Sequence, residues 1–313
     1  MSSAPRRARV RALAKINLDL RVLGKRPDGY HELRTIFQTI SLADTLEIAF
    51  TPGRKASIEM EDALNIPDNL AVRAARLVLQ AARASGKVEL RLTKRIPMGA
   101  GLGGGSSDAA AVLLALPVLI GRVLPLPRLC KLAAELGSDV TFFLLGGRAV
   151  GIGRGNELFP LPDGPAGQGV LIAPGVHVST AEAYRRLSTS LTTELQQNKI
   201  VTFTSQVWPG GEADTGCNDF EAVVFQQHPR LAALKKRLRQ AGASPALMSG
   251  SGSAVFGLFR TGEAVARALA VVEKENAFRI SLVSRARYRA MWWRALEGHI
   301  TQRIWPPQSR YAP

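Results

Sequence analysis

A glycine-rich segment at residues 97–110 contains the residues best suited to bind a polyphosphate. Its sequence, PMGAGLGGGSSDAA, has five glycines and then two serines, and an apolar stretch typical of a helix begins at its end. Glycines allow successive backbone N–H groups to turn toward one anion. The helix start adds unpaired N–H groups and the positive end of a dipole. The segment therefore predicts a phosphate-binding loop, with a flexible linker or a tight turn as the alternative.

This loop differs from the two commonest phosphate-binding motifs. A Walker-type loop requires Lys and then Ser or Thr after its last glycine, whereas a serine follows directly here. The dinucleotide pattern GxGxxG occurs at Gly99, Gly101 and Gly104, but alone it is weak evidence. Ser106 and Ser107 are able to cap the helix or to offer hydroxyl groups to phosphate and metal.

Two charged residues in apolar surroundings are candidates for catalysis. Lys15 lies in AKINL, a segment typical of a strand, and a buried lysine requires an anionic partner. The alternative is an edge lysine whose ammonium reaches water. Asp139 lies between a glycine that ends a helix and an apolar segment. It is therefore either a helix N-cap or a catalytic carboxylate.

A turn at residues 27–29, Pro-Asp-Gly, is followed directly by Tyr30 and His31. An adjacent aromatic ring and imidazole suit a nucleobase, which they can stack on and hydrogen-bond, although either could instead fill a seam between domains. Residues 248–254, MSGSGSA, suit either backbone exposed to a ligand or a tight turn.

The composition indicates an ordinary globular protein. Of 313 residues, 46% are hydrophobic and 21% are charged. The longest apolar run, 109–120, is too short to cross a membrane and is interrupted by Pro117. Cys130 and Cys217 cannot supply a disulfide framework, and no Cys/His cluster has zinc spacing. Because residues 1–10 lack the apolar core of a signal peptide, we expect a cytoplasmic protein with no membrane partner.

The net charge of +16 has three possible explanations: a nucleic-acid partner, anionic small-molecule substrates, or a compositional bias without function. The basic residues are spread along the whole chain, and aromatic residues make up only 6%, so no stacking platform for single strands is apparent. We favour the compositional bias and expect no nucleic-acid partner. The sequence makes no prediction of oligomeric state.

Segments with strand and helix patterns alternate along the chain, as is typical of α+β or α/β domains. We expect one or two strands over 9–23 and two more over 35–50, divided around 43–44. The other expected helices are 69–84, 106–116, 126–136, 179–187, 228–241 and 262–273, and the other expected strands are 88–92, 169–173, 254–259 and 278–283.

A stretch rich in Gly and Pro at 151–169 predicts a crossing between two domains. We therefore expect an N-terminal domain over 1–155, a C-terminal domain over 156–283, and a basic tail with tryptophans over 284–313. Residues 188–214 are polar and irregular, which favours a surface insertion. The tail has no clear period after residue 295, so we expect its removal to leave activity near normal.

Six segments, in this order, resemble the superfamily of galactokinase, homoserine kinase, mevalonate kinase and phosphomevalonate kinase, and within it the 4-(cytidine 5'-diphospho)-2-C-methyl-D-erythritol kinases. They are AKINL at 14–18, DGYHEL at 28–33, the glycine-rich segment at 97–110, GSDVTFF at 137–143, NDFE at 218–221 and SGSGSA at 249–254. The resemblance covers about residues 11–283. One departure is Thr141, where the family commonly has proline.

The resemblance implies an α+β fold of two domains. The N-terminal, nucleotide-binding domain would be a ribosomal-protein-like α/β domain, and the C-terminal, substrate-side domain would be α+β with an antiparallel sheet. It implies ATP and Mg²⁺ as cofactors. The implied reaction is phosphorylation of the 2-hydroxyl of the cytidylated methylerythritol, a step of non-mevalonate isoprenoid precursor biosynthesis.

The resemblance also implies roles for particular residues. Lys15 and Asp139 would be the catalytic pair, Tyr30 and His31 would bind the cytosine, and Asn17 would be a neighbouring polar contact to substrate. Mg²⁺ would be bound mainly by the ATP phosphates, with Ser107 as a protein contact. Asn69 and Lys94 fall near the adenine, and the residues implied around the phosphates are Pro97, Met98, Gly99, Ala100, Gly101, Leu102, Gly103, Gly104, Gly105, Ser106 and Ser107.

Two alternatives belong to other substrates or another class of protein. A homoserine or mevalonate kinase would share the loop but would lack the DGYH turn at this place. A basic RNA-binding protein would account for the charge, but it would have no use for Lys15, Asp139 and the loop together.

Overall fold

The structure is a computed structural model that describes residues 4–26, 29–188 and 216–312. Two long antiparallel strands, β1 (Arg6–Lys25) and β2 (His31–Pro52), pair over nearly their whole length. Three shifts of register interrupt the pairing, and such bulges let a strand bend. β2 continues without a break from His31 to Pro52, so the expected division of residues 35–50 into two strands around 43–44 is wrong.

The first sheet contains six strands in the order β3-β4-β2-β5-β6, with β1 paired to β2. β3 and β4 are parallel, while the other pairs are antiparallel. The sequence pattern missed β3, β5 and β6, which are short and partly exposed or glycine-containing. The strands added here are β3 (Ser57–Asp62), β4 (Gly86–Thr93), β5 (Arg148–Gly153) and β6 (Glu157–Pro160).

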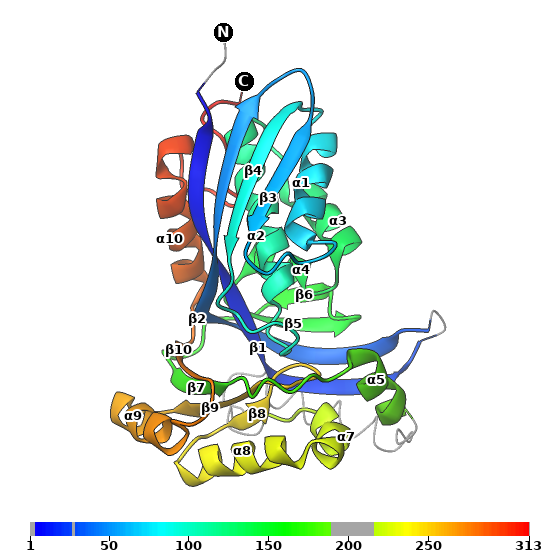
Figure 1. Ribbon diagram of the computed structural model, residues 1–313, viewed down its shortest axis with the longest axis vertical. Coiled ribbons are helices and arrows are strands. Elements are labelled where there is room, and N and C mark those ends of the chain that lie inside the picture. Colours follow the sequence, from blue (N-terminus) through cyan, green and yellow to red (C-terminus); the bar gives the residue numbers. More distant parts are fainter. Residues whose placement is uncertain (1–3, 27–28, 189–215, 313) are drawn as a thin grey trace.

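Four helices, α1 (Leu70–Ala81), α2 (Gly104–Ile120), α3 (Leu126–Leu136) and α4 (Val140–Leu145), cover one face of this sheet (Figure 1). α2 is central and is buried from Ser107 to Leu119. Its expected end at residue 116 is wrong, because the helix continues through Pro117. A proline in a helix costs about 3 kcal/mol, which burial of the two following apolar residues, at about 1.5–3 kcal/mol each, offsets.

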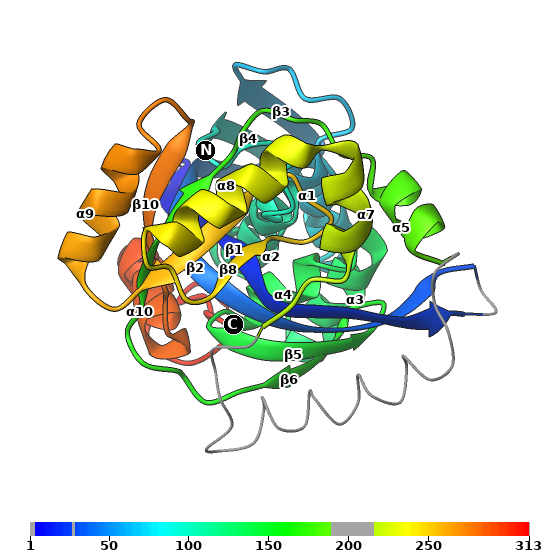
Figure 2. The same cartoon turned by 90° about the horizontal axis from the view of Figure 1, so that it is seen from below.

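The second sheet is antiparallel throughout, as expected, with the strand order β10-β7-β9-β8. Viewed from below, α8 lies across the strands and α9 lies beside β10 (Figure 2). The strands are β7 (Gln168–Ile172), β8 (Ala246–Met248), β9 (Val255–Phe259) and β10 (Ala277–Ser281). The helices are α5 (Thr180–Ser188), α7 (Phe220–Gln227), α8 (Pro229–Gln240) and α9 (Gly262–Val271). The expected insertion at 188–214 lies almost entirely outside the described residues.

β1 and β2 extend from the first sheet into the second half of the fold (Figure 1). Single β-bridges join Leu20 to Asn218 and Ile40 to Leu282, and a shared cluster of buried apolar side chains fills the junction. A division of the chain into two domains near residue 155 remains a proposal. That point lies between β5 and β6, which pair with each other in the first sheet. No described helix is long and apolar enough to cross a membrane.

The tail packs against the first half. Its helix α10 (Arg285–Ala295) lies beside β1 (Figure 1), and Tyr288 and Trp292 are buried in the same apolar cluster as α2. Trp305 Nε1 donates a hydrogen bond to the carbonyl oxygen of Leu144 at 2.9 Å. The expectation that the tail is dispensable therefore conflicts with the structure, in which the tail completes a core.

Candidate active site

A cavity of about 620 Å³ opens where the two halves meet. Segments far apart in the sequence converge on it: β1 and β2, the glycine-rich loop, the start of α4, the segment before α5, and the turn after β8. Among its lining residues are Lys15, Asn17, Thr35, Gly99, Gly101, Gly103, Ser106, Asp139, Arg154, His177, Tyr184, Gly250, Ser251 and Gly252.

Lys15 and Asp139 meet at this cavity. Lys15 Nζ lies 3.5 Å from Asp139 Oδ2 and donates a hydrogen bond to Asn17 Oδ1 at 2.7 Å. The lysine side chain is only 5% exposed, so it is not an edge lysine that reaches water. Asp139 occupies the N-cap position of α4, but its side chain makes no capping hydrogen bond. Its carboxylate points to the lysine instead.

Asn17 is oriented by a chain of buried hydrogen bonds. Its Nδ2 donates to Thr35 Oγ1 at 2.7 Å, and that hydroxyl donates to the carbonyl oxygen of Asp19 at 2.7 Å. Since the amide nitrogen is engaged in this way, the amide oxygen faces Lys15. Asn17 lines the cavity as expected, and it also positions the lysine.

The glycine-rich loop borders the same cavity with Gly99, Gly101 and Gly103. All three have left-handed φ values, of +65°, +76° and +68°, which L-residues with a side chain rarely adopt. Gly103 is the N-cap of α2, so Ser106 and Ser107 lie inside the helix and do not cap it. The 17-residue helix α2 thus begins at the cavity that Lys15 also lines, and the N–H groups of its first turn lie at that end.

Two contacts dock the loop between the halves. The backbone N–H of Lys15 donates to the carbonyl oxygen of Leu102 at 3.0 Å, and Ser249 Oγ donates to that of Gly101 at 3.0 Å. A Cβ on Gly101 would lie 2.1 Å from the Ser249 carbonyl oxygen, so this close approach requires glycine.

Asn218 accounts for two motifs at once. Its Nδ2 donates to the carbonyl oxygens of Met248 and Gly250, both at 2.7 Å, and its Oδ1 accepts from the backbone N–H of Phe220 at 3.0 Å. The NDFE segment therefore fixes the SGSGSA turn that forms one wall of the cavity.

An aromatic group lies at the other end of the cavity. The His31 ring stacks on Tyr184, with centroids 4.6 Å apart, and Tyr184 packs edge-on against Phe220. The guanidinium of Arg154 lies 3.7 Å from the centroid of the half-exposed Tyr30 ring. Tyr184 and Arg154 line the cavity, whereas Tyr30 and His31 contact these two residues and do not line it themselves.

Burial sets the protonation of this group. It lowers the pKa of His31, with a smaller effect of the Lys25 charge, so the imidazole is neutral at neutral pH. Burial also raises the pKa of Tyr184 to about 12, helped by the Asp139 carboxylate. The Tyr184 hydroxyl therefore stays a hydrogen-bond donor.

Comparisons with known proteins agree with this geometry. The family profile described as GHMP kinases N terminal domain matches residues 69–147, and that described as GHMP kinases C terminal matches residues 210–277. The 4-diphosphocytidyl-2-C-methyl-D-erythritol kinase of Solibacter usitatus is 69% identical over 99% of this chain and 100% of its own. The chain belongs to this family of GHMP kinases. It is an ATP-dependent small-molecule kinase.

Other relatives support the same assignment. The Geobacter sulfurreducens protein of the same name is 41% identical, covering 86% of this chain and 96% of its own. A crystal structure of 4-(cytidine 5'-diphospho)-2C-methyl-D-erythritol kinase matches with a TM-score of 0.74 and 39% identity, covering 88% of this chain and 98% of the other. A homoserine kinase from Cytophaga hutchinsonii, at 19% identity and a TM-score of 0.72, shares the fold.

Three of the ATP-binding residues expected in this GHMP kinase lie outside the cavity and use their side chains for other contacts. Asn69 caps α1, since its Oδ1 accepts from the backbone N–H of Ala71 at 2.9 Å. The Lys94 ammonium is bound by two buried carboxylates. Ser107 is buried, and its hydroxyl donates to the Leu13 carbonyl oxygen at 2.7 Å. This placement argues against Ser107 as a metal contact.

The other loop residues divide between surface and core. Met98 is 61% exposed, while the side chains of Ala100 and Leu102 are buried in the apolar cluster at the junction. Ala100 and Leu102 can therefore offer a ligand only their backbone. Pro97, Gly104 and Gly105 do not line the cavity.

The structure adds Tyr184, Arg154 and His177 to the residues predicted around the cavity. No sequence pattern singled them out. Tyr184 follows a capping-box sequence, which the contact from the Glu182 N–H to Ser179 Oγ at 3.4 Å bears out, but that motif marks only the helix.

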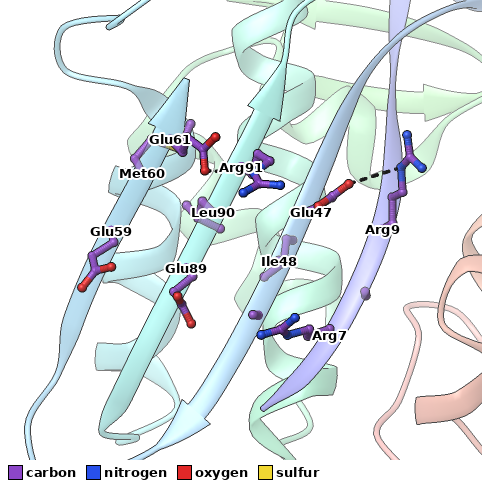
Figure 3. Close-up of a pocket in the computed structure, with 12 residues that line it drawn as sticks. Arg7, Arg9, Glu47, Ile48, Glu59, Met60, Glu61, Glu89, Leu90 and Arg91 are labelled. Atoms are coloured by element: carbon purple, nitrogen blue, oxygen red, sulfur yellow. Dashed lines mark hydrogen bonds and ion pairs between the residues drawn. The ribbon is translucent and has the colours of Figure 1, made fainter. Parts of the chain in front are cut away.

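A second hollow, of about 590 Å³, lies on the open face of the first sheet. Figure 3 shows its side chains standing on β1–β4, with Arg9 directed to Glu47. Arg91 likewise pairs with Glu61, at 2.9 Å. Its charged residues are the basic Arg7, Arg9 and Arg91 and the acidic Glu47, Glu59, Glu61 and Glu89. Because nucleic-acid sites need an excess of cations, this face does not support the RNA-binding alternative.

Proposed function

We propose that this kinase transfers the γ-phosphoryl group of ATP to the 2-hydroxyl of 4-(cytidine 5'-diphospho)-2-C-methyl-D-erythritol, in non-mevalonate isoprenoid precursor biosynthesis. One observation carries the proposal: the Lys15–Asp139 pair and the glycine-rich loop share one cavity. The name of a 69% identical relative supplies the acceptor. Free Cys130 and Cys217 agree with the cytoplasm as the proposed location.

Lys15 and Asp139 carry the proposed chemistry. Asp139 Oδ2 orients the acceptor hydroxyl and takes its proton as the new P–O bond forms. The bond between the γ-phosphorus and the bridging oxygen of ATP breaks in the same step, and ADP leaves. The Lys15 ammonium, 3.5 Å from that carboxylate, stabilises the charge on the transferring phosphoryl group. Asn17 Oδ1 accepts a hydrogen bond from Lys15 Nζ and so holds the ammonium in place for both roles.

The glycine-rich loop and the start of α2 bind the phosphates of ATP through backbone N–H groups. Among the described residues there is no cluster of three His, Cys, Asp or Glu side chains that could bind a metal. This fits Mg²⁺, which keeps several waters and is bound largely by substrate phosphates. When bound, Mg²⁺ neutralises phosphate charge.

The aromatic group binds the cytosine in this proposal. Tyr30 and His31 lie against the cavity wall and would extend the site with an aromatic ring and a neutral imidazole that can hydrogen-bond the base. Tyr184 and Arg154 form the adjoining wall of the cavity, where Arg154 also suits the diphosphate of the acceptor.

Release of ADP, followed with purified protein and ATP, tests the proposal. The cytidylated methylerythritol should support turnover, while mevalonate and homoserine should not. Turnover with either control acceptor alone would replace the proposed substrate. RNA binding that weakens with salt, without any ATP turnover, would favour the RNA-binding alternative.

A further inference from the structure

Three buried charged residues connect the two ends of the glycine-rich loop. Lys94 precedes the glycines of the loop by a few residues, and Asp108 follows them in the first turns of α2. Asp44 belongs to β2. Lys94 Nζ is 2.5 Å from Asp44 Oδ2 and 2.8 Å from Asp108 Oδ2. The three side chains are 8%, 0% and 3% exposed, so water screens this cluster little.

Asp44 ties the incoming end of the loop to the sheet. Its Oδ1 accepts hydrogen bonds from the backbone N–H groups of Arg95 at 2.6 Å and Ile96 at 2.8 Å. One buried carboxylate thus fixes three consecutive residues, 94 to 96, directly before the loop.

The lysine ties the outgoing end to the same place. Its ammonium bridges to Asp108 in α2, and a Cβ on Gly104, the first residue of that helix, would lie 3.2 Å from Lys94 Nζ. The charge therefore packs against the backbone where α2 begins. A buried ammonium is costly unless it is paired, so the lysine resists displacement from its two carboxylates.

We propose that Lys94, Asp44 and Asp108 are positioning residues that hold the glycine-rich loop in the shape that binds the ATP phosphates. Lys94 acts through the loop, and its ammonium makes no contact with adenine. The inference rests on the proposed function, in which this loop binds ATP.

Lys94→Met and Asp108→Asn test this role. The Kd of ATP and the inhibition constant of inorganic tripolyphosphate, which lacks a base, should both rise about 10- to 100-fold, because small displacements of a positioned site cost about that much. The KM of the acceptor should change less than about twofold, and kcat at saturating ATP should stay within about threefold.

Lys87→Met is the matched control. Lys87 lies near the start of β4, the strand that ends just before Lys94. It also pairs with two carboxylates, Glu59 at 2.9 Å and Glu89 at 3.2 Å, but it is 40% exposed. Its replacement should leave ATP and tripolyphosphate binding unchanged. Equal losses in Lys87→Met and Lys94→Met would reduce the effect to general charge and overturn the proposal.

The outcomes separate positioning from its rivals. If Lys94→Met weakens ATP but not tripolyphosphate, the lysine contacts the base and the proposal is wrong. If Asp108→Asn, which keeps the shape of the side chain, unfolds at a lower temperature but binds both ligands normally, the cluster is only structural. The double variant should bind ATP no more weakly than Lys94→Met, since residues that act as a unit are non-additive. Failure of the wild type to bind ATP would instead contradict the proposed function.

Discussion

At the scale of single residues, the site depends on a lysine that is buried and yet charged. Lys15 is placed between the Asp139 carboxylate and the Asn17 amide oxygen, and the Phe37 ring centroid lies 5.3 Å from its Nζ. The amide oxygen accepts a hydrogen bond from the ammonium, and the ring makes a cation–π contact with it. The carboxylate, 31% exposed, keeps access to the cavity. Asn17 is thus held in place by its hydrogen bonds, whereas the Asp139 carboxylate is open to a substrate in the cavity.

Replacement of His31 should affect the acceptor and spare ATP. For His31→Ala we expect weaker binding of the acceptor, because Tyr184 loses the ring that stacks on it. The loss in binding free energy should be about 1–3 kcal/mol if it equals that of one base stack. The KM values of both substrates measure this. His228→Ala, at the junction of α7 and α8, is the control. Equal losses for ATP and acceptor would make His31 a structural residue only.

The protonation of His31 predicts a pH dependence. Burial and Lys25 lower its pKa below the usual 6.5, so the neutral form is favoured in the folded chain. Acidification therefore works against both the fold and acceptor binding, and only below that value. The KM of the acceptor should be constant from pH 8 to 6.5 and should rise at lower pH. A rise already between pH 8 and 7 would contradict the assignment.

At the scale of elements, the loop owes its shape to neighbours that are distant in sequence. The pattern of glycines predicted where the loop lies in the sequence. It did not predict that the Ser249 carbonyl packs against Gly101, or that the Lys15 N–H donates to the Leu102 carbonyl. The expected serine caps failed for the same reason. The left-handed Gly103 starts the helix earlier, and this buries Ser107 against β1.

A single methyl group can test whether phosphate approaches the loop closely. Gly103→Val is unsuitable, because a Cβ there would lie 2.9 Å from the Phe143 ring in a left-handed residue. Gly105 does not itself line the cavity, but it is exposed in the first turn of α2. Its Cβ would meet only Leu70 Cδ1, at 3.7 Å, and Leu70 does line the cavity. Alanine favours a helix over glycine by about 1 kcal/mol. Gly105→Ala should therefore keep the thermal midpoint or raise it, while ATP binds about tenfold more weakly.

Gly298→Ala is the control for this substitution, since nothing lies within 4 Å of its added methyl group. It should change neither quantity. ATP affinity unchanged in Gly105→Ala would show that phosphate does not approach this turn of α2.

At the scale of the whole molecule, local patterns predicted more than long-range packing did. The helix expected at 69–84 follows from local signals, and the structure confirms it over Leu70–Ala81, with Asn69 as its cap. The position of Tyr184 beside His31 depends on how α5 packs against the long strands, which no local pattern encodes. Tyr288 and Trp292 are buried one turn apart on α10, and Trp305 packs edge-on against Tyr288 from beyond the helix, a contact that no helical period encodes.

Removal of the tail from residue 285 should destabilise the protein. It would strip Tyr288, Trp292 and Leu296 from the first core, and a large buried side chain contributes about 1.5–3 kcal/mol. That sum is comparable to the whole stability of a typical domain, about 5–15 kcal/mol. Thermal unfolding should show a much lower midpoint or no cooperative transition. A truncated chain with the wild-type midpoint would return the tail to a dispensable role, and removal of residues 312–313 alone is the control.

The proposed phosphoryl transfer depends on the carboxylate that faces Lys15. Turnover of Asp139→Asn, at saturating ATP and acceptor, tests it most directly. Asparagine keeps the shape and caps a helix about as well as aspartate, so fold and binding should survive while turnover falls about 10²–10⁴-fold. Asp68→Asn, a surface residue that is 78% exposed, should retain wild-type turnover. Near-normal turnover of Asp139→Asn would contradict the mechanism and leave Asp139 as a terminal residue of α4.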